Sequence, residues 1–82
     1  MPVIKKRICI VEDKKDLREG MNMMLQLSEN YELVGSYANA EEAMEKIPGI
    51  LPDAVLMDIN LPGASGITCV TVLKTRFPGM LF

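Results

Sequence analysis

The chain alternates between short apolar runs and longer segments in which apolar residues recur every three or four positions. Three runs, residues 8–11, 31–37 and 54–57, have the length of strands. The first and third are almost wholly apolar, as strands buried on both faces of a parallel sheet are. The second is more polar and has a possible bulge at Gly35, which suits the edge of a sheet.

The segment after the first run predicts an amphipathic helix. Asp13 or Asp16 is expected to cap its N-terminus. Its inward face is expected to comprise Leu17, Met21, Met24, Leu25 and Ser28. We interpret the methionines of this segment as core residues, because core packing is the commonest role of methionine at helical spacing.

A second helix is predicted after the edge strand from the residues at its two ends. Asn39 and Glu42 have the spacing of a capping box, with Asn39 as the cap. Pro48 and Gly49 are expected to stop this helix at about Ile47.

Residues 67–74 can be interpreted in two ways. Their β-branched composition favours a strand, whereas apolar residues at 67, 70, 73 and 77 fall on one face of a helix. Successive parallel strands need a crossover connection, so we predict a helix that begins at Ser65 or Gly66 and is ended by Pro78. Residues 80–82 then resemble the beginning of a fourth strand. The alternation of strands and helices predicts a doubly wound α/β fold with a parallel sheet.

The composition of the chain excludes several classes of protein. The chain has 82 residues, 49% of them hydrophobic, and a net charge of −2, which describes a globular chain without a strongly basic surface for nucleic acid. No apolar stretch approaches the ~20 residues of a membrane span, and no secretory signal pattern is present, so we expect a cytoplasmic location. The absence of histidine excludes histidine-based catalysis. Cys9 and Cys69 lie in apolar segments and are expected to be reduced core residues.

Acidic residues stand directly after two of the buried runs. Glu12 and Asp13 follow the first run, and Asp58 follows the third. Parallel strands end at one edge of a sheet, so these carboxylates converge if the two strands are neighbours. Three like charges either retain a proton or bind a cation, and an oxygen-only ligand set suits Mg²⁺. A carboxylate can then serve as a nucleophile toward a phosphoryl group, although acids at strand ends also serve simply to cap helices.

Three local patterns resemble the receiver domain of bacterial two-component response regulators. They are residues 8–13 (ICIVED), residues 55–62 (VLMDINLP) and Gly66, which follows Pro62 at the family's spacing. The resemblance covers all 82 residues and implies the flavodoxin-like receiver fold with strand order 2-1-3-4-5. It also implies that Pro62 and Gly66 shape the loop between strand and helix. Residues 18–21 and 33–37 resemble the subfamily whose output is a helix-turn-helix DNA-binding domain.

The resemblance implies a role for each site residue. Asp58 would accept a phosphoryl group from the phosphohistidine of a sensor histidine kinase, in a signalling module that is not itself an enzyme. Asp13 and Asp58 would ligate Mg²⁺ directly, and Glu12 would act through water or help to hold the site. The backbone carbonyl of Asn60 would complete the metal shell, and its side chain would tune the lifetime of the phosphoryl group.

The chain departs from the family by stopping where the fourth strand begins. The family's switch Ser/Thr, the Lys after its fifth strand and its aromatic switch residue are all absent from it. We therefore expect residues 1–82 to be an incomplete receiver domain of three strand–helix units and the start of a fourth strand. Residues 80–82 would form an unpaired apolar edge, so self-association or exchange of elements between copies is expected for this segment.

Three other functions stay open. A haloacid-dehalogenase-like phosphatase also uses Mg²⁺ and an aspartate at a strand tip, but it requires a second aspartate where this chain has Asn60. A flavodoxin-like cofactor binder requires a phosphate-binding loop rich in Gly, Ser or Thr, whereas residues 12–16 read EDKKD. A receiver fragment that takes no phosphate and serves as an interaction module also fits, because the absent Lys and Ser/Thr stabilise the phosphoryl group in the family.

Overall fold

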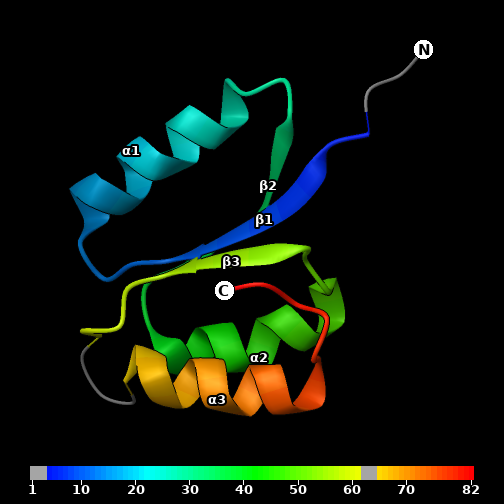
Figure 1. The fold of residues 1–82 in the computed structure, drawn as a ribbon. Helices are drawn as coiled ribbons and strands as arrows, with labels where there is room; N and C mark the ends of the chain where they lie inside the picture. Colours follow the sequence, from blue (N-terminus) through cyan, green and yellow to red (C-terminus); the bar gives the residue numbers. More distant parts are fainter. Residues whose placement is uncertain (1–3, 62–64) are drawn as a thin grey trace.

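A parallel sheet separates two layers of helices in the computed structural model, which describes residues 4–61 and 65–82 (Figure 1). Helix α1 lies on one face of the sheet, and α2 and α3 pack beside each other on the opposite face. The elements in chain order are β1 (Lys6–Val11), α1 (Lys15–Gln26), β2 (Tyr31–Tyr37), α2 (Ala40–Ile50), β3 (Ala54–Met57) and α3 (Gly66–Arg76). The predicted α/β class and the predicted alternation of strands and helices are confirmed. Within these residues no helix is long and apolar enough to cross a membrane.

Strand β1 occupies the centre of the sheet, which has the order β2-β1-β3. Both pairings are parallel, and β1 and β3 stay in register from Ile8 opposite Ala54 to Val11 opposite Met57. The two strands therefore end together, so the residues that follow them emerge at one edge of the sheet.

The pairing of β1 with the edge strand β2 contains a bulge. Ile8 is opposite Leu33 and Cys9 is opposite Gly35, so Val34 is the extra residue. The irregularity predicted at Gly35 is present one position earlier. A Cβ atom at Gly35 would overlap with the Tyr37 hydroxyl and would lie 2.8 Å from Tyr37 Cζ and 3.0 Å from the Cys9 sulfur, which explains why the residue after the bulge has no side chain.

Helix α1 begins without a side-chain cap. Its N-cap residue is Lys14, whose side chain makes no capping hydrogen bond, so the prediction that Asp13 or Asp16 caps this helix is wrong. Asp13 precedes the cap position and its carboxylate belongs to the acidic cluster described below. Asp16 lies inside the first turn, where its negative charge interacts favourably with the helix dipole.

Helix α2 begins as predicted but runs past its predicted end. The Asn39 side chain accepts a hydrogen bond from the Glu42 N–H at 2.8 Å, which confirms the cap. At the other end, the helix continues through Pro48 to Ile50, and Leu51 then adopts a left-handed conformation with φ of 52°. The expectation that Pro48 and Gly49 stop this helix is therefore wrong.

The side chain of Arg7 accounts for the longer helix. Its Nη1 donates to the carbonyl oxygens of Ile50 at 2.9 Å and Leu51 at 3.1 Å, which gives partners to carbonyls at the end of the helix. Ile47 is fully buried in the core. Core burial and this tertiary cap together offset the hydrogen bond that Pro48 cannot donate.

Helix α3 and the residues after it follow the prediction. Ser65 caps the helix, and its Oγ accepts a hydrogen bond from the Thr68 N–H at 3.1 Å. The need for a crossover thus outweighs the β-branched composition of this segment. Leu81 then forms a parallel bridge with Ala54, which puts the start of the predicted fourth strand beside β3.

The main core lies between the sheet and the layer of α2 and α3. Its buried members are Cys9, Val11, Tyr37, Ala40, Ala43, Ile47, Val55, Leu61, Cys69, Leu73 and Met80. Cys9 and Cys69 are both buried and free of disulfides, as predicted. The Cys69 sulfur lies 4.0 Å from the Ala40 carbonyl oxygen, and the small side chain of Ala40 permits this close approach of the two helices.

The opposite face of the sheet is covered less fully. In the described residues α1 alone lies over it, and none of its side chains is buried. Met23 and Met24 are 62% and 74% exposed, so the interpretation of the methionines as core residues is wrong for these two. A groove of about 660 Å³ runs over this face, with Leu25 and Leu56 among its lining residues.

Candidate functional site

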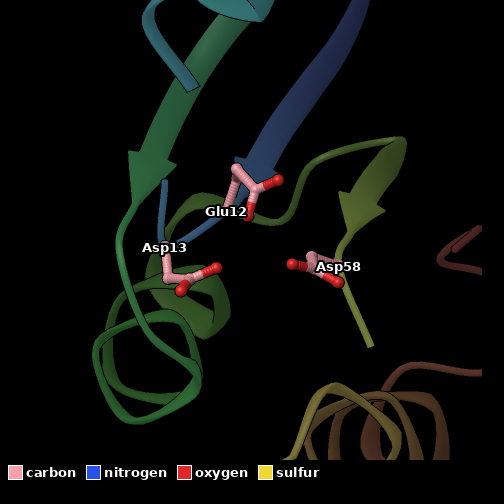
Figure 2. Close-up of side chains that lie close together, drawn as sticks. All are labelled: Glu12, Asp13 and Asp58. Carbon is pink, nitrogen blue, oxygen red and sulfur yellow. The ribbon is translucent and has the colours of Figure 1, made fainter. Parts of the chain in front are cut away.

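Three carboxylates meet at the edge of the sheet where β1 and β3 end. Glu12 and Asp13 come directly after β1, and Asp58 comes directly after β3. One oxygen from each carboxylate lies within 4.8 Å of the others. Figure 2 shows the three side chains directed into a common space between the two strand ends. The structure therefore brings together the three acids that the sequence analysis selected.

Backbone hydrogen bonds carry the sheet pattern one residue beyond each strand. The Asp58 N–H donates to the Val11 carbonyl oxygen at 3.0 Å, and the Glu12 N–H donates to the Tyr37 carbonyl oxygen at 3.0 Å. Both acids are thus fixed by the central strand and its neighbours. Their side chains can converge without further ordering of the chain, which is the preorganisation that a binding site needs.

The acid cluster also accepts hydrogen bonds from its own loops. The Asn60 N–H donates to Asp58 Oδ1 at 2.9 Å, and the Lys14 N–H reaches Glu12 Oε2 at 3.4 Å. Asn60 is therefore part of the turn that orients Asp58. Its role as a metal ligand through its backbone carbonyl stays a prediction.

The pKa values of Glu12 and Asp58 are shifted in opposite directions. Glu12 is only 5% exposed, and burial raises its pKa, as do hydrogen bonds from its carboxyl group to Asp13 and Asp58. The pKa of Asp58 is lowered, first by the Asn60 N–H and then by the hydrogen bond from Glu12, with a further contribution from the positive charge of Lys14. These opposite shifts mean that, of these two acids, Glu12 takes up a proton more readily than Asp58.

The donor set fits a hard divalent cation. Glu12, Asp13 and Asp58 offer carboxylate oxygens only, and Mg²⁺ is bound in proteins through one or two carboxylates and several waters. A cation at this point would balance the negative charge that the three carboxylates bring together. Asp58 and Asp13 are less buried than Glu12, which leaves room for metal-bound water on their side.

Helix α3, which follows Asp58 in the chain, packs closely against the backbone of Asp58 and Ile59. A Cβ atom at Gly66 would overlap with the Asp58 carbonyl oxygen and would lie 2.6 Å from Ile59 Cα. Gly66 thus lets α3 begin directly against the end of β3, in agreement with its predicted role in the loop. Pro62, the other residue predicted to shape this loop, lies outside the described residues.

The sequence analysis did not select Arg18, whose side chain reaches the same loop. Its Nη1 donates to the carbonyl oxygen of Glu12 at 2.8 Å and lies 3.5 Å from that of Asp13. The available signal was a cation one turn into a helix that begins just after an acid pair. At that position a long side chain can turn back over the helix N-terminus.

Comparison with known proteins agrees with this geometry. A profile of the response regulator receiver domain matches residues 8–81. The transcriptional regulatory protein LnrK of Bacillus subtilis is 34% identical over 74 residues, which are 90% of this chain and 34% of LnrK. A protein-glutamate methylesterase/protein-glutamine glutaminase of Methanosarcina acetivorans is 36% identical over 88% of this chain and 21% of its own length. The chain therefore spans about a third or less of these two relatives.

A solved structure gives the same result for the fold. The signal receiver domain of the putative response regulator NarL from Mycobacterium tuberculosis superimposes with a TM-score of 0.86 at 28% identity, over 94% of this chain and 63% of the other. The sheet order and the acids at the two strand ends belong to the segment that the receiver profile matches. On these grounds the chain belongs to the family of response regulator receiver domains.

Proposed function

We propose that this chain is the phosphoacceptor part of a two-component signalling system and takes a phosphoryl group onto Asp58. The observation that carries the proposal is the position of Asp58 at the end of β3, with its carboxylate within reach of Glu12 and Asp13. Membership of the receiver family supports it. The donor would be the phosphohistidine of a sensor histidine kinase in the cytoplasm.

The chemistry follows from the charges of the site. An oxygen of the Asp58 carboxylate attacks the phosphorus, the phosphorus–nitrogen bond of the phosphohistidine breaks, and the imidazole leaves with the electron pair and takes up a proton. The lowered pKa of Asp58 keeps its carboxylate ionised and so available as a nucleophile. Mg²⁺, held by Asp13 and Asp58 with Glu12 beside them, would offset the negative charge of the incoming phosphoryl group.

This chain spans 34% of LnrK, so we propose that the output of the signal comes from other parts of a longer protein. LnrK is a transcriptional regulatory protein, and 90% of this chain matches it, so we propose that the output is transcription through a DNA-binding domain. The methylesterase relative shares only 21% of its length with this chain, so its enzyme activity is not carried over. We propose a receiver that is not itself an enzyme.

Labelling tests the acceptor. The chain, and a longer protein that contains it, would be incubated with acetyl phosphate and Mg²⁺ and analysed by peptide mass spectrometry. We expect a base-labile acyl phosphate on Asp58 in the longer protein, lost in Asp58→Asn and kept in the control Asp16→Asn. The 82-residue chain should react slowly, because the family's Lys and Ser/Thr are absent from it. Label that persists in Asp58→Asn would place the acceptor elsewhere.

A second candidate function is an interaction module that takes no phosphate. The specific observation in its favour is the partly covered sheet face beside α1, where Leu56 is 44% exposed. We propose that the 82-residue chain by itself associates with a second copy through this face. Failure of the longer protein to be labelled at all would favour this function over phosphoacceptance.

A further inference from the structure

We infer that Arg18 is a positioning residue, whose guanidinium fixes the backbone of the Glu12–Asp13 pair so that both carboxylates face Asp58. The inference rests on the proposed function, because it concerns the same Mg²⁺ site. It goes beyond that function by assigning a role in metal affinity to a side chain that contacts none of the three carboxylates in the described hydrogen bonds.

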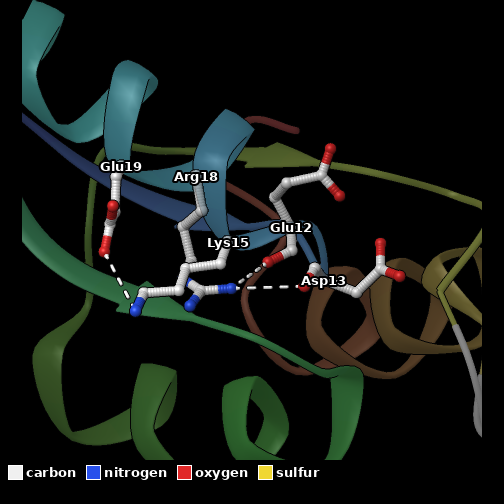
Figure 3. Close-up of polar contacts among 5 residues, drawn as sticks. All are labelled: Glu12, Asp13, Lys15, Arg18 and Glu19. Carbon is white, nitrogen blue, oxygen red and sulfur yellow. Dashed lines mark hydrogen bonds and ion pairs between the residues drawn. The ribbon is translucent and has the colours of Figure 1, made fainter.

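The Arg18 side chain links helix α1 to the backbone of the loop that follows β1. Arg18 lies in the second turn of α1, and its Nη1 donates to the Glu12 carbonyl oxygen at 2.8 Å, with the Asp13 carbonyl oxygen at 3.5 Å. A single nitrogen with two N–H groups can serve both oxygens. Figure 3 shows the guanidinium on the side of the backbone oxygens, with both carboxylates turned away from it.

Other hydrogen bonds hold the two ends of this loop, but among the described hydrogen bonds only Arg18 binds the Glu12 and Asp13 carbonyl oxygens. The Glu12 N–H is bound to the Tyr37 carbonyl oxygen, which fixes one side of this residue to β2. The other side leads through Asp13 to Lys14, a helix N-cap without a capping side chain. Arg18 therefore supplies the hydrogen bonds that orient the carbonyl side of the Glu12 and Asp13 residues. Without them the Asp13–Lys14 peptide keeps only the 3.4 Å contact of the Lys14 N–H with Glu12 Oε2, so the direction of the Asp13 carboxylate is less firmly fixed.

The charge of Arg18 and its positioning role predict opposite changes in Mg²⁺ binding when the side chain is removed. As a positive charge near the site, Arg18 repels a divalent cation, so its removal should strengthen Mg²⁺ binding. As a positioning residue it preorganises two carboxylates, so its removal should weaken binding. Loss of a partner that orients a metal ligand typically weakens metal binding by about 10- to 100-fold. The sign of the change therefore distinguishes the two roles.

The test is a Mg²⁺ titration followed by NMR shifts of the Asp58 amide in the 82-residue chain or a longer protein that contains it. Arg18→Gln removes the charge and the guanidinium that binds the two carbonyl oxygens. Arg18→Lys keeps the charge but replaces the planar donor group with a single ammonium. We expect weaker binding in both, by about tenfold in Arg18→Gln. The matched control is Lys15→Gln, since Lys15 is exposed in the first turn and pairs only with Glu19 at 3.9 Å among the described ion pairs. It should bind Mg²⁺ as tightly as the wild type or slightly more tightly.

The possible results distinguish an error in the role of Arg18 from an error in the proposed Mg²⁺ site. If Arg18→Gln binds as tightly as Lys15→Gln, the positioning role is wrong. If Arg18→Gln does not fold, Arg18→Lys decides, and wild-type affinity in that variant overturns the inference. Asp13→Asn tests the site itself. Wild-type affinity in Asp13→Asn would overturn the proposed metal site, whereas loss of affinity there with normal binding in the Arg18 variants would overturn only the role of Arg18.

Discussion

Gly66 lies directly against the carbonyl oxygen of Asp58, so the first residue of α3 and the residue after β3 fix each other's position. No space exists there for a Cβ atom, which would overlap with this oxygen. The Gly66 N–H also donates to the Ile59 carbonyl oxygen at 3.3 Å. The direction in which Asp58 points therefore depends on how closely α3 approaches.

Gly66→Ala is predicted to weaken both the fold and the site. The added methyl must push α3 or the Asp58 backbone aside, which typically costs about 1–3 kcal/mol of unfolding free energy. A displaced Asp58 should also bind Mg²⁺ more weakly. Urea unfolding and a Mg²⁺ titration measure the two effects.

Gly20→Ala is the matched control for this substitution. Gly20 lies inside α1 with no atom near its missing Cβ, so alanine there should stabilise the chain by about 0.5–1 kcal/mol through helix propensity. Equal stability and equal Mg²⁺ affinity in Gly66→Ala and the wild type would show that α3 does not position Asp58.

Mg²⁺ binding is predicted to strengthen as the pH rises. The raised pKa of Glu12 means that the metal-free cluster holds a proton at pH values where a free glutamate is ionised, and a cation must displace it. Affinity should therefore increase with pH until Glu12 is ionised in the folded chain, and then level off. In Glu12→Gln this dependence should be lost. A titration series at several pH values that is flat for the wild type would contradict the assignment of the proton to Glu12.

The same raised pKa predicts that Glu12 destabilises the metal-free chain at neutral pH. An acid whose pKa is raised by folding stabilises the fold below its unfolded pKa, and this contribution is lost as the pH rises through the folded value. Glu12→Gln should therefore raise the unfolding midpoint at pH 7 without divalent cations, and the gain should shrink at acidic pH. Thermal unfolding monitored by circular dichroism measures it.

Asp58 and Glu19 give the comparisons for this prediction. Asp58 has a lowered pKa, so its contribution is present above the unfolded pKa and is lost as the pH falls through the folded value. Glu19→Gln removes an exposed charge from α1 and should change stability little. A Glu12→Gln variant that melts no higher than Glu19→Gln at pH 7 would contradict the expected strain at Glu12.

The local pattern of the chain was sufficient to select the acids of the cluster. Glu12 and Asp58 each follow an apolar run directly, and parallel strands bring their ends to one edge, so these acids converge once the two strands are neighbours. The order β2-β1-β3 then follows from the family resemblance. These features depend on neighbours in sequence and on the common direction of the strands, so they can be predicted without a structure.

Features that depend on a side chain from elsewhere could not be predicted in this way. Helix α2 continues past Pro48 because Arg7, from β1, binds the carbonyls at its end. The contact of Arg18 with the acid loop depends on where α1 turns relative to β1. The exposure of Met24 depends on what covers the sheet beside α1, and helical spacing alone gives no information about this.

The partly covered face beside α1 is expected to make isolated copies of the chain associate. Leu56 is 44% exposed in β3, and Leu81 and Phe82 beside it are 63% and 39% exposed. Burial of apolar surface contributes roughly 25 cal/mol per Å², so covering a few hundred Å² stabilises an association by several kcal/mol.

We expect the isolated 82-residue chain to sediment at micromolar concentration with a mass above that of one chain. Leu56→Glu should reduce this mass toward that of a single chain. Ile67→Glu is the control, because Ile67 is also exposed, at 62%, but lies on α3, across the sheet from this face. A wild-type chain that sediments as a monomer and unfolds in one concentration-independent transition would show that three strands and their helices suffice for a stable fold.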